Sequence, residues 1–206
     1  MVCIVCIGDS IVEGEGDDKG LSGWVGRLSI SQLKNKKVGE NRVYNLGMGM
    51  ETSIDLLHRL YSEVLYRKPE VIILQAAHGD SRHMNNNSGK NEYEIGKKAR
   101  MRTYYRIFDF LSKSKIKVLI IGLNPVCEIK YKKERVDLYQ KHVESTRRGL
   151  KRLCKEYNLN FIDPKENIFE DKDLTEFYVD GIHPNAKGYD LMFEKISNKL
   201  KELKYI

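Results

Sequence analysis

The 206-residue sequence predicts an α/β protein of three layers, in which helices cover both faces of a parallel β-sheet. Five short runs rich in β-branched and other apolar residues recur along the chain, each with the length of a buried strand. The segments between them carry an apolar residue every three or four positions, which is typical of amphipathic helices. Because parallel strands need helical crossovers, this alternation indicates one parallel sheet.

The expected strands and helices alternate from one end of the chain to the other. The strands are Val2–Ile7, Val43–Leu46, Val71–Gln75, Val118–Gly122 and Asn160–Ile162. The helices are Gly23–Lys34, Ser53–Tyr66, Tyr93–Ser114, Glu134–Tyr157 and Asn185–Lys201. In the fourth helix, one stripe collects Leu138, His142, Thr146, Leu150 and Leu153. Five strands linked in this way fit the flavodoxin-like order 2-1-3-4-5, in which ligands bind at the carboxyl ends of the strands near the first and third.

Two connections at that edge of the sheet are longer than the usual two to six residues, namely Asp80–Glu92 and Asn124–Lys133. Such segments are often plain surface loops, but long loops also form the rims of active sites. The sequence leaves both interpretations open.

Length and composition predict one domain that spans residues 1–206, because single cores keep growing to roughly 250 residues. The apolar run at the start, VCIVCI, has no basic flank and no small-residue cleavage site, and it is too short to be a signal peptide or a membrane span. We therefore expect a cytoplasmic protein with reduced cysteines, present as a monomer or a small homo-oligomer.

The net charge of +7 raises the question of an anionic partner. The basic residues are spread over KKVGENR, GKKARMR, KYKKER and STRRGLKR, where acids are mixed in, and no nucleic-acid-binding motif is present. A solvated lysine-rich surface explains this pattern, so we expect no specific nucleic-acid binding.

A metal site has little support in the sequence. Cys3 and Cys6 form a CxxC, but residues three apart on a strand point to opposite faces, so their thiolates are not placed to share a metal. The five histidines show no HExxH or similar spacing. We expect structural cysteines, no metal and no cofactor.

Candidate catalytic residues lie near both ends of the chain. The first strand runs directly into Gly8-Asp9-Ser10, which puts the serine at the edge of the sheet where this fold binds ligands. Asp180 and His183 stand three residues apart, just before the last helix, and can meet in one tight turn. A carboxylate that accepts a hydrogen bond from one ring nitrogen leaves the other nitrogen to take a proton from a serine.

These motifs resemble those of the SGNH/GDSL hydrolases. GDSIVEGEGDDKGLSGWVGRL is similar to the first sequence block of that family, NLGMGMETSIDLLHRL to the second and YVDGIHPNAKGYDLM to the last. ILQAAHGDSR occupies the place of the third block, and GLNPV followed by a charged helix resembles the rest. The resemblance covers nearly the whole chain and implies a serine esterase or acylhydrolase that cleaves a carboxylic ester or thioester.

The resemblance also implies roles for single residues. Ser10 is the expected nucleophile, His183 the general base and Asp180 the residue that orients the base. Asp9 and Asp80, each beside a motif position, are expected to contact the substrate.

In this family the oxyanion of the tetrahedral intermediate is bound by the serine amide, a second-block amide and a third-block asparagine side chain. The second-block position, usually glycine, is Met50, next to Gly49. The asparagine position is Gly79, in Ala77-His78-Gly79-Asp80.

Loss of one such donor costs about a hundred- to a thousandfold in turnover, so a slow enzyme is expected. His78 could supply a substitute donor, and other candidates are Asn85, Asn86, Asn87 and Asn124. Replacing Gly79 by asparagine is expected to raise turnover if the backbone there accepts a side chain.

Two other classes compete with this interpretation. Gly47-Met48-Gly49 follows a strand, as in dinucleotide-binding modules, but no third glycine follows at the required spacing. No phosphate-loop GxxxxGK[ST] and no GxSxG of the α/β-hydrolases occur. The second alternative is a catalytically weak or inactive relative that keeps the fold as a binding protein, which the missing asparagine suggests. The acyl and leaving groups of the substrate stay open, because fold does not determine them.

Overall fold

The computed structural model describes residues 2–34, 41–85, 91–93, 95–130, 136–138 and 140–206. Five parallel strands form its central sheet, in the spatial order β2-β1-β3-β6-β8. They are β1 Cys3–Gly8, β2 Arg42–Gly47, β3 Val71–Gln75, β6 Lys117–Ile121 and β8 Asn160–Ile162. Numbered among themselves, these strands have the order 2-1-3-4-5, which confirms the predicted fold class.

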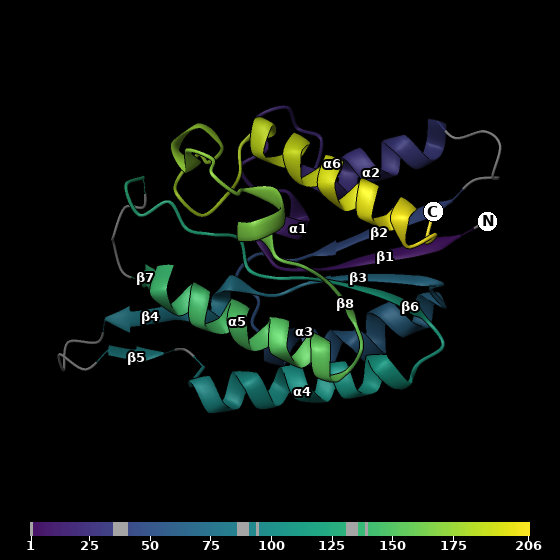
Figure 1. Ribbon diagram of the computed structural model, residues 1–206, viewed down its shortest axis with the longest axis horizontal. Coiled ribbons are helices and arrows are strands. Elements are labelled where there is room, and N and C mark those ends of the chain that lie inside the picture. Colours follow the sequence, from purple (N-terminus) through teal and green to yellow (C-terminus); the bar gives the residue numbers. More distant parts are fainter. Residues whose placement is uncertain (1, 35–40, 86–90, 94, 131–135, 139) are drawn as a thin grey trace.

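Helices cover both faces of this sheet (Figure 1). One face is covered by α2 Gly23–Lys34 and α6 Ala186–Glu202. The other is covered by α3 Ser53–Arg59, α4 Lys97–Lys113 and α5 Gln140–Glu156. Helix α3 continues through a π-helical turn, Leu60–Val64, and a 3-10 turn, Leu65–Arg67. The remaining short helices are α1 Ser10–Glu13, His78–Ser81, Pro164–Ile168 and Leu174–Glu176.

Two apolar cores lie on the two sides of the sheet because side chains alternate along each strand. In β1, Val5 and Ile7 belong to the core under α3, α4 and α5, whereas Ile4 and Cys6 belong to the core under α2 and α6. Cys3 packs against the first of these cores, so the two cysteines of the CxxC do face opposite sides of the sheet.

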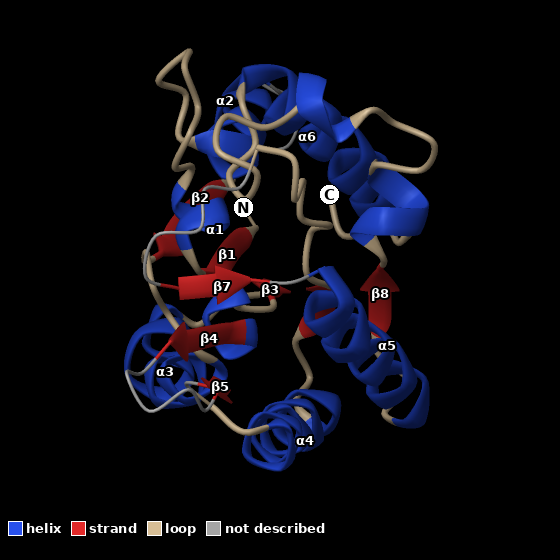
Figure 2. Cartoon of the chain, turned by 90° about the vertical axis from the view of Figure 1, so that its left-hand side faces the viewer, coloured by secondary structure: helices blue, strands red, loops and turns tan. Residues whose placement is uncertain are grey.

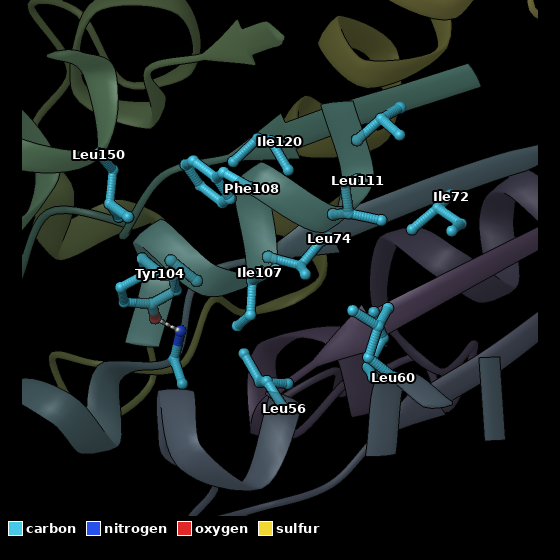
Figure 3. Packing of buried hydrophobic residues seen from close by; sticks show 14 of the residues in the cluster. Leu56, Leu60, Ile72, Leu74, Tyr104, Ile107, Phe108, Leu111, Ile120 and Leu150 are labelled. Carbon is cyan, nitrogen blue, oxygen red and sulfur yellow. Dashed lines mark hydrogen bonds between the residues drawn. The ribbon is translucent and has the colours of Figure 1, made fainter. Parts of the chain in front are cut away.

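The first core also anchors the chain that leads to the third sequence block. Figure 3 shows Tyr104, Ile107 and Phe108 of α4 packed among apolar residues of the sheet and of α3. The Tyr104 hydroxyl accepts a hydrogen bond of 3.1 Å from the Ala77 amide, just past the end of β3. The core therefore holds this turn in place through a polar contact as well as through packing.

A second, antiparallel sheet was not predicted. Its strands are β4 Arg82–Asn85, β5 Asn91–Tyr93 and β7 Val136–Leu138, in the order β5-β4-β7. The first connection expected to be a loop thus contains two strands. The helices expected to start at Tyr93 and Glu134 start at Lys97 and Gln140, and Leu138 is not on the helical stripe. The reason is pairing: β4 bonds to β5 on one side and to β7 on the other.

The small sheet lies beside the edge at which the parallel strands end (Figures 1 and 2). Helix α1 starts at the same edge, directly after β1. Within the described part of the chain, no helix is both long enough and apolar enough to span a membrane.

Candidate active site

The first candidate residue, Ser10, stands at the amino end of α1, where β1 turns into the helix. Asp9 caps this helix, its Oδ1 accepting a hydrogen bond of 3.0 Å from the Ile11 amide. The turn needs a glycine before it, since a Cβ on Gly8 would lie 2.9 Å from the Gln75 carbonyl oxygen of β3. The Ser10 side chain thus emerges at the carboxyl edge of the sheet, as predicted from its place after the first strand.

Asp180 and His183 form a local turn in front of α6. Oδ1 of Asp180 accepts hydrogen bonds from the amides of Ile182 (2.9 Å) and His183 (2.8 Å). Gly181, between them, has a φ of 94°, which favours glycine. This turn brings Oδ2 of Asp180 to 2.6 Å from Nδ1 of the His183 ring.

The two motifs meet across the sheet edge. Nε2 of His183 lies 2.9 Å from Oγ of Ser10, although the two residues are 173 positions apart in the sequence. With Nδ1–H donating to Asp180, Nε2 is free to accept the serine proton. The structure therefore brings together the three residues that the sequence singled out, in the geometry of a nucleophile, a base and an orienting carboxylate.

The electrostatics of the pair suit a base. Burial by itself raises the pKa of Asp180, but the hydrogen bonds from the ring and amide of His183 and from the Ile182 amide lower it to about 2. Burial lowers the pKa of His183, but the hydrogen bond to Asp180 and the negative charges of Asp180, Glu15 and Asp9 outweigh it, and the net pKa is raised. The imidazolium that forms when His183 takes a proton is thus stabilised.

Asp9, which is expected to contact the substrate, has its carboxylate held by groups of the protein itself. It is buried, and its Oδ2 accepts hydrogen bonds from the His78 amide (2.7 Å) and from Nδ1 of the His78 ring (3.1 Å). Burial raises the pKa of Asp9, but these bonds to His78 and the bond from the Ile11 amide outweigh it and lower the pKa. Asp9 therefore ties the nucleophile turn to the third-block turn.

The His78 side chain is not placed to donate to an oxyanion either. Nε2 of its ring lies 3.1 Å from the Asn124 carbonyl oxygen, so both ring nitrogens already face oxygen acceptors. His78 is buried, as is Asn124, whose side chain bonds to Gln75 at 3.3 Å. Of the other candidate donors, Asn85 lies in β4, while Asn86 and Asn87 lie outside the described residues.

The second-block turn keeps the backbone shape that glycine usually supplies. Met50 has a φ of 68°, in the left-handed region that residues other than glycine adopt only under strain. In the described part of the chain, the amides of Ser10 and Met50 meet no hydrogen-bond acceptor. The Gly49 amide does, because it donates to Oε2 of Glu13 at 2.7 Å. A Cβ on Gly49 would lie 3.9 Å from the Ser10 Cβ, so this turn borders the nucleophile.

Gly79 has no room for a side chain. A Cβ there would lie 2.3 Å from the Glu51 carbonyl oxygen and 3.3 Å from that of Met50. Asp80, expected to contact a substrate, is fully buried, and its Oδ1 accepts 2.9 Å hydrogen bonds from the Ser53 amide and hydroxyl. The second-block and third-block turns therefore pack directly on each other, and Asp80 anchors the start of α3.

The second-block turn and the residues that follow Ser10 each border a hollow. One, of about 270 Å³, is bordered by the second-block turn and α3, with the exposed side chains of Met48 and Met50 on its wall. The other, of about 400 Å³, is lined by residues that follow Ser10, including Glu13, Glu15 and Asp17. Glu15, for which the sequence predicts no role, has its Oε2 3.3 Å from Nε2 of His183. The acidic run GEGDD, which follows the serine by a few residues, is the feature of the sequence from which such a carboxylate could have been expected.

Among all the residues that the structure describes, no group of three or more His, Cys, Asp or Glu side chains is placed so that it could hold a metal ion.

Comparison with known proteins relates this geometry to a family. The family model described as the GDSL-like Lipase/Acylhydrolase family matches residues 6–191. No curated protein matches the chain significantly.

Several solved structures share the fold. A lipase/acylhydrolase from Enterococcus faecalis is 24% identical, with 98% of this chain and 96% of that chain covered and a TM-score of 0.79. A GDSL-like lipase from Bacteroides thetaiotaomicron is 19% identical, with coverages of 98% and 88% and a TM-score of 0.71. An acetylxylan esterase from Geobacillus stearothermophilus is 17% identical, with coverages of 97% and 94% and a TM-score of 0.75. At these identities the likeness establishes the fold.

Proposed function

Because the chain belongs to the GDSL-like lipase/acylhydrolase family, we propose that it is a serine esterase that cleaves carboxylic esters or thioesters through an acyl-serine intermediate. The observation that carries the proposal is the hydrogen-bonded line from Ser10 Oγ through the His183 ring to Asp180, with contacts of 2.9 and 2.6 Å. Such a line is what an activated serine requires.

In the first half of the reaction, Oγ of Ser10 attacks the substrate carbonyl carbon as its proton passes to Nε2 of His183. The carbonyl π electrons move to the oxygen, which becomes the oxyanion of a tetrahedral intermediate. When this collapses, the C–O or C–S bond breaks, and the leaving group takes the proton from Nε2. Asp180 keeps the ring oriented and stabilises the imidazolium throughout.

In the second half, water replaces the alcohol or thiol. Nε2 of His183 takes a proton from the water as its oxygen attacks the acyl carbon, and a second tetrahedral intermediate forms. Collapse breaks the bond to Ser10 Oγ, which recovers its proton from Nε2, and the acid is released. The enzyme returns to its starting state with one water consumed.

The proposed oxyanion donors are the backbone amides of Ser10 and Met50. Both meet no acceptor in the described part of the chain, and the second-block turn borders the nucleophile. Preorganised amides of this kind bind the charge that develops on the oxygen. The family's third donor is an asparagine side chain, and Gly79 at that position has no side chain to donate. This absence supports a low turnover.

The alternative is a weak or inactive relative that binds ligands without cleaving them, and the missing third-block asparagine is the observation that favours it. Labelling by a fluorophosphonate separates the two functions, because it needs an activated serine and no knowledge of the substrate. We expect the wild-type protein to be labelled and the Ser10→Ala protein not to be. A folded wild-type protein that resists labelling would favour the binding function.

The substrate is best approached with a panel of p-nitrophenyl esters from acetate to palmitate, next to an acyl-coenzyme A and an acetylated sugar. The sugar is included because one structural neighbour is an acetylxylan esterase. Hydrolysis that persists at the wild-type rate in the Ser10→Ala protein would refute the assignment of the nucleophile.

A further inference from the structure

The hollow of about 400 Å³ that is lined by residues after Ser10 is acidic, but two of its three acidic side chains are held by other groups. Asp17 forms a buried ion pair with Arg27, with 2.5 Å between Oδ2 and Nη1. Glu13 accepts the hydrogen bond from the Gly49 amide. Neither carboxylate is directed at the reacting atoms by these contacts.

Glu15 differs from these two, because its carboxylate contacts the proposed base itself. Its side chain is 57% exposed, and Oε2 lies 3.3 Å from Nε2 of His183. This is the same nitrogen that lies 2.9 Å from Ser10 Oγ. A carboxylate so close to a ring nitrogen favours its protonated form, which agrees with the raised pKa of His183.

The position of Glu15 matters for the leaving group. In the proposed mechanism, Nε2 of His183 hands its proton to the leaving oxygen or sulfur, so that atom must come within hydrogen-bond distance of Nε2. The part of the leaving group next to the scissile bond then lies beside the Glu15 carboxylate, which contacts the same Nε2. Of the three acids that line the hollow, Glu15 is therefore the one whose contacts place it against the leaving group.

We propose that Glu15 selects the leaving group of the ester: its carboxylate accepts a hydrogen bond from a hydroxyl or ammonium group near the scissile bond and disfavours an anionic group there. This inference rests on the proposed esterase function and narrows it to esters of polyhydroxylated or cationic alcohols. The net charge of +7 does not oppose it, because the basic residues are dispersed over the chain and charges beyond about 8 Å are largely screened at physiological salt.

The test uses three acetates with the same acyl group and different charges on the leaving phenol: 4-acetoxybenzoate, its methyl ester and (4-acetoxyphenyl)trimethylammonium. Each kcat/KM is divided by the rate constant for alkaline hydrolysis, which removes differences in intrinsic reactivity. We expect the corrected values to fall from the cationic to the neutral to the anionic ester. Two unit charges 4 to 6 Å apart in water change a rate constant by about three- to fivefold.

Glu15→Gln removes the charge and keeps the shape. We expect it to raise the anionic-to-neutral ratio by about three- to fivefold and to lower the cationic-to-neutral ratio by a similar factor. Glu194→Gln is the matched control, since it also removes the charge of an exposed glutamate, in the middle of α6, and it should leave both ratios unchanged. Added salt should narrow the wild-type ratios and leave those of Glu15→Gln nearly constant.

The outcomes separate this inference from the function on which it rests. If the wild-type protein cleaves all three esters and Glu15→Gln leaves both ratios unchanged, Glu15 does not select the leaving group, although the esterase function stands. If cleavage of the three esters is absent, or survives Ser10→Ala, the esterase function fails and the inference fails with it. Equal shifts in Glu194→Gln would show a long-range charge effect and also overturn the inference.

Discussion

Replacing Gly79 by asparagine restores the residue that the family has in its third block, but the structure predicts that this change alone lowers stability and does not raise turnover. A Cβ at this position would lie 2.3 Å from the Glu51 carbonyl oxygen, more than an ångström inside ordinary contact. Since that oxygen belongs to the backbone, the second-block turn must move as a whole. The gain expected from the sequence required a backbone that accepts a side chain.

The size of the effect follows from the crowding. Overpacking of this kind costs about 1–3 kcal/mol. In a chain of this length, each kcal/mol lowers Tm by about 2–4 °C, so Gly79→Asn should melt roughly 2–12 °C below wild type. Gly96→Asn is the control, because a Cβ on Gly96 would have no atom within 4 Å and asparagine suits its place at the cap of α4. Its Tm should equal or exceed that of wild type.

A second variant tests whether the two turns are coupled. Met50 holds a left-handed φ of 68°, which costs about 1–3 kcal/mol and which glycine adopts freely. Adding Met50→Gly to Gly79→Asn should therefore recover part of the lost Tm, because a glycine lets the backbone that carries the Glu51 carbonyl shift with less strain, and this shift gives the asparagine space to reach the oxyanion. We expect turnover on p-nitrophenyl acetate to exceed that of Gly79→Asn by about tenfold or more.

Thermal melts followed by circular dichroism test the predicted changes in Tm, and initial rates at saturating substrate test the predicted changes in turnover. If Gly79→Asn alone melts at the wild-type temperature and turns over ten times faster, the Glu51 carbonyl is no obstacle and the reasoning is wrong.

The remaining predictions concern the base and the turn behind the nucleophile. Asp180→Asn should fold normally, since an amide oxygen can still cap the turn, and should lose up to about ten-thousandfold in kcat because the amide can hold the ring in the wrong tautomer; near-full activity would refute the orienting role. The acid limb of kcat/KM should lie above pH 6.5, the ordinary pKa of histidine, because the pKa of His183 is raised and its neutral form is the active one. Activity therefore falls as pH drops, and Glu15→Gln should shift this limb to lower pH, whereas an unshifted limb would contradict the contact. His78→Ala should lower Tm by several degrees, since it leaves the buried Asp9 carboxylate without its ring partner; an unchanged melt would show that the pair is dispensable.

The parallel sheet and the turn that joins Asp180 to His183 could be predicted because both depend on local patterns. Apolar runs of strand length, separated by helical periods, are enough to indicate a parallel sheet, and Ser10 follows the first run directly. Asp180 and His183 are three residues apart, and Gly181 lets one turn join them. Because the serine follows the first strand and the Asp180–His183 turn precedes the last helix, we expect both motifs at the carboxyl edge of the sheet.

The small antiparallel sheet could not be predicted in this way. β4 pairs with β7 from a segment more than fifty residues further on, and neither strand is longer than four residues. Segments so short show no period from which strand can be told from loop or helix. Their structure comes from the partner, which only the fold brings close.

The details of the site were decided by the same kind of long-range approach. Residue types and spacing identified Ser10, Asp180 and His183, but they could not show that the Glu51 carbonyl fills the space beside Gly79 or that Glu15 reaches His183. The sequence by itself determined which groups can react, because that depends on side-chain chemistry and on neighbours along the chain. Tertiary structure decided which of those groups touch, because a close approach between distant segments depends on how the turns pack at the edge of the sheet.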